Sequence, residues 1–427
     1  MDRGILKRAV ATSAGIAVGA AMLAGCGQRE GGETAAPTAT VDSSPATGEI
    51  VVWAAENEGQ TLEALAETFQ EENPDVTVTI TPITFDDLPR KIDTAVAGGE
   101  VPDIVQPSTG LQTFVTNGAI APVPADLVDT SIYFDGALDA ATFDDVLYGV
   151  PWYVTVQSYY FREDIAEEAG LEAPTTWDEA VEFAGAMQEE GVDIGNAQFT
   201  TGVGAWQTVL PLIFQAGGNV VDDEGNFVLD SPEVVEALDH YQRFFREGVA
   251  DPTYTITAAG EVEADLADGR VGSYTTGSYS YGIALDALDG DESKIGVSPL
   301  PAGPESNAGY LGGSTLSVME GAENADAAWK FIRYATTVEA EQQAYDVSGV
   351  LPAARDSWNS GPLADSAEGQ AFAAQLEESV PAPKVLTWTE VRDVIAEYAE
   401  QVAREVITPE EAAAAIQDEA ERIGTGE

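Results

Sequence analysis

Polar side chains follow two of the strands that this sequence predicts. They come directly after the apolar runs 49–55 and 101–106, and they are Glu56, Asn57, Glu58, Ser108 and Thr109. Carboxylate, amide and hydroxyl groups accept or donate hydrogen bonds to a polar ligand. Ligands of open parallel sheets bind beyond the carboxyl ends of the strands, so both segments are candidate binding loops. In a chain with 74 acidic residues a single acid is more often solvated, and that alternative stays open for both glutamates.

Cysteine and histidine each occur once. Cys26 cannot form a disulfide within the chain, and one thiol gives no metal site of the paired-cysteine kind. His240 lies among polar positions of a helical pattern, where we expect an exposed side chain without a catalytic partner. The sequence also has no nucleophile elbow, phosphate-binding loop or zinc-ligand cluster. We therefore expect no metal and no cofactor.

The residues before Cys26 have the parts of a secretory signal: a basic start, an apolar stretch and two small residues. The stretch is short for a membrane span and rich in alanine and glycine, so we expect residues 1–25 to be removed. Leu23-Ala24-Gly25-Cys26 resembles the bacterial lipobox, in which the cysteine is lipidated and becomes the new N-terminus. The alternative is a signal peptide with a chance cysteine.

Composition separates a tether from a folded body. Residues 26–48 are mostly Gly, Thr, Ser, Pro and Ala, so we expect a disordered tether and a fold that begins near Glu49. The remaining length exceeds what one core usually serves, which indicates two domains or lobes. The net charge of −56 excludes nucleic acid as a partner. Because the acids are spread along the chain, they indicate either a surface adapted to high salt or a moderately acidic secreted protein.

Apolar periodicity predicts alternating strands and helices at the start of the folded body. Strands are expected over 49–55, 76–83 and 101–106, with helices over 87–99, over 110–117 and around Leu62, Leu65, Ala66 and Phe69. This βαβαβ order indicates a parallel sheet with helices on both faces, an α/β fold.

Helix starts recur farther along the chain. Thr176 and Thr408 are each followed three residues later by a glutamate, which predicts two capping boxes. Ser231 precedes a proline at the first helical position. The helix that follows places Val234, Leu238, Tyr241 and Phe245 on one apolar face.

The segment "LYGVPWYVTVQSYYFREDIAEEAGLEAPTTWDEAVEFA" at 147–184 resembles the extracellular solute-binding proteins of bacterial ABC importers, in particular the sugar-binding group with maltose- and trehalose-binding proteins. Shared features are tyrosine-glycine-x-proline, a strand that ends in a tyrosine pair, and "TWDE". Further matches are "LADGRVGSYTTGSYSYG" at 266–282, and segments at 296–318, 326–358 and 383–423. This ordered set spans nearly all of 49–423.

The resemblance implies a periplasmic-binding-protein fold: two α/β lobes joined by hinge strands, with a ligand cleft between them. Mapped on this chain, one lobe would comprise 49–153 plus 312–347, and the other 154–311 plus 348–427. A ligand that touches both lobes would favour the closed arrangement.

The resemblance also implies a site for sugar, which needs flat aromatic surfaces and hydrogen-bonding groups. Candidates beyond the strand-end residues are Trp152, Tyr153, Trp206, Tyr279, Tyr281, Gly312, Gly313, Arg355 and Trp388. Trp206 and Tyr279 lie in glycine-flanked segments, read here as loops, where the family places stacking residues. Core packing is the alternative for every aromatic candidate, and the case for binding is stronger for Trp206 and Tyr279 than for the others. The glycines could instead permit a turn, and Arg355 could instead pair with a surface carboxylate.

What the resemblance implies is a binding lipoprotein and not an enzyme. It would be a monomer on the outer face of the cytoplasmic membrane, held by lipid on Cys26, which delivers a sugar to an ABC permease. Two alternatives stay open: a binding protein for polyamines or other cations, and a surface glycoside hydrolase that uses two carboxylates.

Overall fold

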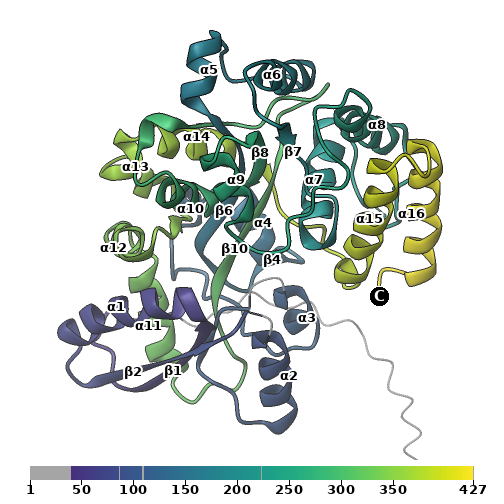
Figure 1. Ribbon diagram of the computed structural model, residues 1–427. Coiled ribbons are helices and arrows are strands. Elements are labelled where there is room, and N and C mark those ends of the chain that lie inside the picture. Colours follow the sequence, from purple (N-terminus) through teal and green to yellow (C-terminus); the bar gives the residue numbers. More distant parts are fainter. Residues whose placement is uncertain (1–39, 86, 108–109, 223, 427) are drawn as a thin grey trace, which may run out of the picture. The chain divides into compact units, whose positions relative to one another are not determined.

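The computed structural model describes residues 40–426 apart from residues 86, 108–109 and 223 (Figure 1). Cys26 and the predicted signal segment lie outside these residues, as do Ser108 and Thr109. Across the described helices, none combines the length and apolar character that a membrane span requires.

A mixed sheet runs through the described chain in the strand order β2-β1-β3-β10-β6-β8-β7. Three short strands pair beside this path, β9 and β11 on β6 and β12 on β10, while β4 and β5 form a separate pair. The strands are β1 (Gly48–Ala55), β2 (Val76–Ile83), β3 (Ile104–Val105), β4 (Thr142–Phe143), β5 (Val146–Leu147), β6 (Val150–Arg162), β7 (Ile194–Ala197), β8 (Val271–Gly277), β9 (Ile295–Ser298), β10 (Gly309–Val318), β11 (Leu351–Pro352) and β12 (Ser379–Val380).

The first strands confirm the sequence prediction. β1 pairs in parallel with both β2 and β3, and the helices between them are α1 (Glu56–Glu72) and α2 (Leu88–Gly98). Leu62, Leu65 and Phe69 of α1 are buried, because their spacing places them on one face of the helix. The α/β fold class is therefore confirmed.

Strand β6 changes partners along its length. Its first half pairs antiparallel with β10 and β11, and its second half pairs antiparallel with β8 and β9. In the β6–β10 pair, Tyr153 is opposite Ser314 and Val154 is opposite Gly313. Both strands thus connect the parallel sheet around β1 with the strands β7 to β9.

The other helices are α3 (Leu111–Thr116), α4 (Asp135–Ala141), α5 (Glu163–Ala169), α6 (Trp177–Glu189), α7 (Gly202–Gln215), α8 (Pro232–Arg246), α9 (Glu261–Ala267), α10 (Ser280–Ala287), α11 (Ala325–Ala335), α12 (Val338–Ser348), α13 (Pro362–Asp365), α14 (Ala367–Leu376), α15 (Trp388–Ala403) and α16 (Pro409–Ile423). α15 packs against α7 and α16, and α16 packs against α8. These four helices share one apolar cluster, separate from the cluster around β1, β6 and β10.

His240 is buried, and the prediction of an exposed side chain was wrong. Its ring stacks on Trp177 at a centroid distance of 4.2 Å and an interplanar angle of 4°. Burial holds the pKa of His240 down at about 3, so the imidazole is neutral. The physical reason is that α8 is covered by α6 as well as by α7 and α16, whereas the apolar pattern of α8 alone showed only one buried face.

Two local predictions need correction. Residues 42–46 belong to the ordered body and not to a disordered tether, because Lys330 of α11 pairs with Asp42 at 2.9 Å and Ala46 is 1% exposed. Thr176 accepts a hydrogen bond from the Glu179 backbone, but the Glu179 carboxylate accepts from Thr175, so the capping box is incomplete. The capping box at Thr408 and the cap at Ser231 are confirmed.

Candidate ligand-binding site

Two hollows open along one face of β6. Alternate side chains of a strand lie on the same face. Pro151 and Tyr153 line a hollow beside β10, which we call the central pocket, and Gln157 lines a second hollow, which we call the Tyr279 hollow. The first part of β6, from Pro151 to Gln157, therefore lines both hollows.

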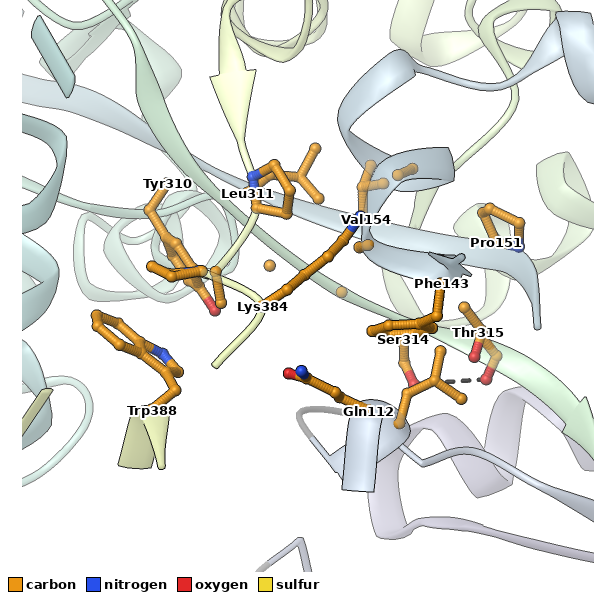
Figure 2. A pocket seen from close by; sticks show the side chains of 18 of the residues that line it. Gln112, Phe143, Pro151, Val154, Tyr310, Leu311, Ser314, Thr315, Lys384 and Trp388 are labelled. Atoms are coloured by element: carbon orange, nitrogen blue, oxygen red, sulfur yellow. Dashed lines mark hydrogen bonds between the residues drawn. The ribbon is translucent and has the colours of Figure 1, made fainter. Parts of the chain in front are cut away.

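The central pocket lies between β6, β10, α3, α4 and the segment that precedes α15 (Figure 2). About 830 Å³ of space free of protein atoms lies in and around this pocket, and part of it is open solvent. Its lining includes Gln112, Phe143, Pro151, Tyr153, Val154, Tyr310, Leu311, Ser314, Thr315, Lys384 and Trp388. Aromatic faces and hydrogen-bonding groups thus meet in one cavity.

Trp206 stands behind this lining. Its indole packs edge-on against Tyr310 at 5.1 Å and against Trp388 at 5.5 Å, and only 2% of the residue is exposed. The expected loop at "GVGAWQ" is the first turn and a half of α7, so that prediction was wrong. Tyr310 and Trp388 line the pocket, and Trp206 supports both of them.

Tyr153 connects the pocket with the end of β1. Burial is the main reason why the pKa of Tyr153 lies well above 10, and the negative charge of Glu58 nearby raises it further. Glu56 and Glu58 belong to the first turn of α1 and not to a loop, because α1 begins directly after β1. Of this segment, Glu58 is half-buried and close to the pocket, whereas Glu56 is exposed. The side chain of Asn57 lies outside the described part.

Gly312 and Gly313 lie in β10 and line the central pocket. A β-carbon on Gly313 would lie 2.3 Å from the Tyr153 carbonyl oxygen, and the φ of Gly313 is +124°, a region that favours glycine. Gly313 therefore permits the close pairing of β10 with β6, and the turn expected as an alternative is not formed there.

The Tyr279 hollow lies among residues of β6, α7 and β8. Tyr279 is 56% exposed, and its hydroxyl is 3.1 Å from the Thr276 hydroxyl. It directly precedes α10 and borders the hollow together with Gln157, Gln207 and Thr276. The ring of Tyr279 is therefore accessible to a ligand in this hollow.

Three predicted residues lie away from both hollows. Trp152 is 1% exposed and belongs to the main apolar cluster. Tyr281 packs edge-on against Phe372 of α14 at 6.4 Å. Arg355 pairs with Glu377 at 3.1 Å and with Asp135 at 3.2 Å, which is the surface-carboxylate alternative. Burial and nearby Glu368 raise the pKa of Tyr281 to about 12.

Sequence reasoning missed Gln157, Tyr310, Phe143 and Lys384. Lys384 carried a usable signal, since the chain has only 18 lysine and arginine residues. Among the residues that the structure describes, no group of three or more His, Cys, Asp or Glu side chains could hold a metal ion.

Comparisons with known proteins show which family and which solved fold the chain resembles. A family model described as bacterial extracellular solute-binding protein matches residues 53–342. A putative binding protein of Brucella abortus is 24% identical over 82% of this chain and 87% of its own length. A lactose-binding protein of Rhizobium radiobacter is 26% identical over 67% of this chain and 69% of its own length. The solved structure of the sugar-binding protein MalE from Xanthomonas citri matches with a TM-score of 0.82 and 27% identity, over 88% of this chain and 97% of that chain.

Proposed function

Because the chain belongs to the bacterial extracellular solute-binding protein family, we propose that it captures a sugar or oligosaccharide and delivers it to the membrane permease of an ABC importer. The periplasmic-binding-protein fold is shared with sugar-binding relatives such as the Xanthomonas citri protein. The relatives are binding proteins and not enzymes, and an exported location follows from the family.

The composition of the central pocket carries the proposal of a sugar. Tyr153, Tyr310 and Trp388 offer flat apolar surfaces for the C–H faces of a pyranose ring. Gln112 and Ser314 offer hydrogen-bonding groups for its hydroxyls. A site with both kinds of group in one cavity matches the chemistry of a carbohydrate better than that of a purely apolar or purely charged ligand.

Capture would take place by closure of the two lobes about β6 and β10, the strands that connect them. The predicted lobes, 49–153 plus 312–347 and 154–311 plus 348–427, divide β6 and β10 near the pairs Tyr153–Ser314 and Val154–Gly313. A rotation there changes the distance between Tyr153 and Tyr279, which lie on opposite sides of this division. A ligand that contacts both lobes then stabilises the closed form by its differential affinity, and the permease recognises that form.

The pocket argues against the two alternatives. A polyamine site needs carboxylates around a cation, but the described lining of the central pocket contains no carboxylate side chain and does contain Lys384. A glycoside hydrolase needs a carboxylate pair on either side of the bond that it cleaves, and the same described lining offers none.

A thermal-shift screen tests the function. Lactose, maltose, longer maltodextrins, spermidine and glycerol phosphate are added to the soluble protein in low and in high salt. At least one carbohydrate is expected to raise the unfolding midpoint, and spermidine is not. Stabilisation by spermidine alone would support the cation-binding alternative, and cleavage of the added sugars would support the hydrolase.

We further propose that the mature protein is a monomeric lipoprotein anchored through Cys26 on the outer face of the cytoplasmic membrane. The lipobox-like sequence supports this. A cysteine with more than one acyl chain suffices for stable anchoring. Cys26→Ser is expected to move the protein from the membrane fraction to the soluble fraction without a change in ligand affinity, and a variant that stays with the membranes contradicts the anchor.

A further inference from the structure

The side chain of Lys384 extends across the central pocket (Figure 2). Its Nζ donates a hydrogen bond to Asp139 of α4 at 2.6 Å and lies 5.6 Å from the centroid of the Phe143 ring. Lys384 belongs to the segment before α15, 245 residues away from Asp139. One side chain therefore joins two walls of the pocket and occupies space between them.

The opposite end of α4 repeats this arrangement. Arg355 pairs with Asp135 at 3.2 Å and lies 5.0 Å from the centroid of the Phe134 ring. Asp135 and Asp139 are four residues apart and lie on one side of the helix. Both carboxylates are thus bound by cations from the C-terminal part of a chain that has only 18 basic residues in all. Of these two cations, only Lys384 lines the pocket.

The position of Lys384 has a cost for any ligand that fills the pocket. Such a ligand must move the lysine side chain aside, and the ammonium group then loses both the Asp139 carboxylate and the Phe143 ring. A partly exposed ion pair of this kind contributes little in absolute terms, which makes displacement feasible. The side chains of Lys384 and Asp139 are 36% and 57% exposed, so salt screens the pair.

We propose that Lys384, held by Asp139, partly blocks the central pocket and sets which ligands it accepts. The inference rests on the proposed sugar-binding function. Ligands that reach the space under α4 must displace the lysine, whereas ligands confined to the aromatic wall at Trp388 need not do so. Lys384 is therefore a specificity-determining residue for the longer carbohydrates.

Two substitutions and one control test the proposal. Lys384→Ala removes the side chain, and Asp139→Asn keeps the lysine but removes its charged partner. Lys294→Met is the matched control, because Lys294 forms an ion pair of similar exposure with Asp291 and does not line the pocket. Lactose and a series of maltodextrins of increasing length are titrated into the soluble wild-type protein and each variant by calorimetry, in low and in high salt.

Lys384→Ala and Asp139→Asn are each expected to lower the Kd of the longer sugars about two- to fivefold, the factor that a pair of this kind represents. The Kd of lactose is expected to stay within error of the wild type. The ratio of wild-type to variant Kd is expected to shrink in high salt, because screening weakens the pair in the wild type. The double variant is expected to gain no more than Lys384→Ala alone, since both changes remove one contact.

Weaker binding by Lys384→Ala would overturn the proposal, because the lysine would then contact the ligand directly. Equal affinity in the wild type and both variants would overturn it as well, while sugar binding itself would stand. If none of the proteins binds any carbohydrate, the proposed function fails and the inference fails with it. A gain for Lys294→Met equal to that of Lys384→Ala would assign the effect to net charge and not to the pocket.

Discussion

The Gln157 side chain donates a hydrogen bond from Nε2 to the Gln207 carbonyl oxygen at 2.8 Å. In a regular helix this carbonyl would accept from the backbone N–H four residues later, but that residue is Pro211, which has none. The Oε1 of Gln157 accepts from the backbone N–H of Tyr310 at 3.1 Å. One side chain of β6 therefore satisfies an open position in α7 and fixes the start of β10, between the central pocket and the Tyr279 hollow.

Gln157→Leu is expected to lower the free energy of unfolding by about 1–3 kcal/mol, because it leaves two partly buried backbone groups without their protein partners. Urea denaturation measures the loss. Pro211→Ala in the same background restores a helical donor for the Gln207 carbonyl and is expected to recover part of it. If Gln157→Leu is as stable as the wild type, the two hydrogen bonds contribute nothing to the fold.

Trp206→Ala is expected to cost about 3–5 kcal/mol of folding free energy, as is usual for a large buried aromatic side chain. The residue is 2% exposed and supports Tyr310 and Trp388, so ligand affinity is expected to fall as well. Chemical denaturation and calorimetry check the two effects. Lost binding with unchanged stability would mean that Trp206 contacts the ligand itself.

Tyr279→Ala is expected to weaken ligand binding with little effect on folding stability. More than half of this residue is exposed, so its loss leaves the free energy of unfolding of the ligand-free protein within about 1 kcal/mol of the wild type. The Kd of a sugar that spans both hollows is expected to rise about tenfold, as the loss of a stacking surface predicts. Tyr279→Phe keeps the ring and serves as the control. Equal affinity in all three proteins would remove Tyr279 from the site.

The local pattern of apolar and polar residues was enough to predict a strand whose contacts are with its neighbours in the sheet. The strand predicted over 76–83 is β2 in full, since its alternation reports its own two faces. Trp206 was placed in a loop because glycines surround it, whereas Gly202 with φ +61° only begins α7. The family resemblance correctly indicated the fold, which no single segment could specify.

Partners from distant parts of the chain explain what the sequence did not predict. His240 is buried by Trp177 of another helix, and Lys384 is held by Asp139, which is 245 residues away. Neither contact can be predicted from the charge or hydrophobicity of the residues nearby in the sequence. Glu58 and Tyr153 were both proposed, but their proximity follows only from the meeting of α1 with β6.

Glu341 of α12 is a buried acid whose titration should be visible in folding stability. It is 1% exposed, and burial raises its pKa to about 8, although hydrogen bonds from the Ser357 hydroxyl at 2.7 Å and the Ala354 backbone at 3.2 Å act in the opposite direction. In the unfolded chain the pKa returns to an ordinary value near 4.5. Between these two values the folded protein holds a proton that the unfolded chain has lost. The contribution of Glu341 therefore lowers stability as pH rises through this window.

Glu341→Gln removes this titration, because the amide stays neutral at every pH. Relative to the wild type, the variant is expected to gain about 3–5 kcal/mol at pH 8.5, and the gain is expected to fall below about 1 kcal/mol at pH 5. Urea denaturation at both pH values gives the difference. Glu339→Gln, an exposed position on the same helix, corrects for the change in net charge. A gain for Glu341→Gln that is no larger at pH 8.5 than at pH 5 would mean that Glu341 titrates as an ordinary acid in the folded protein.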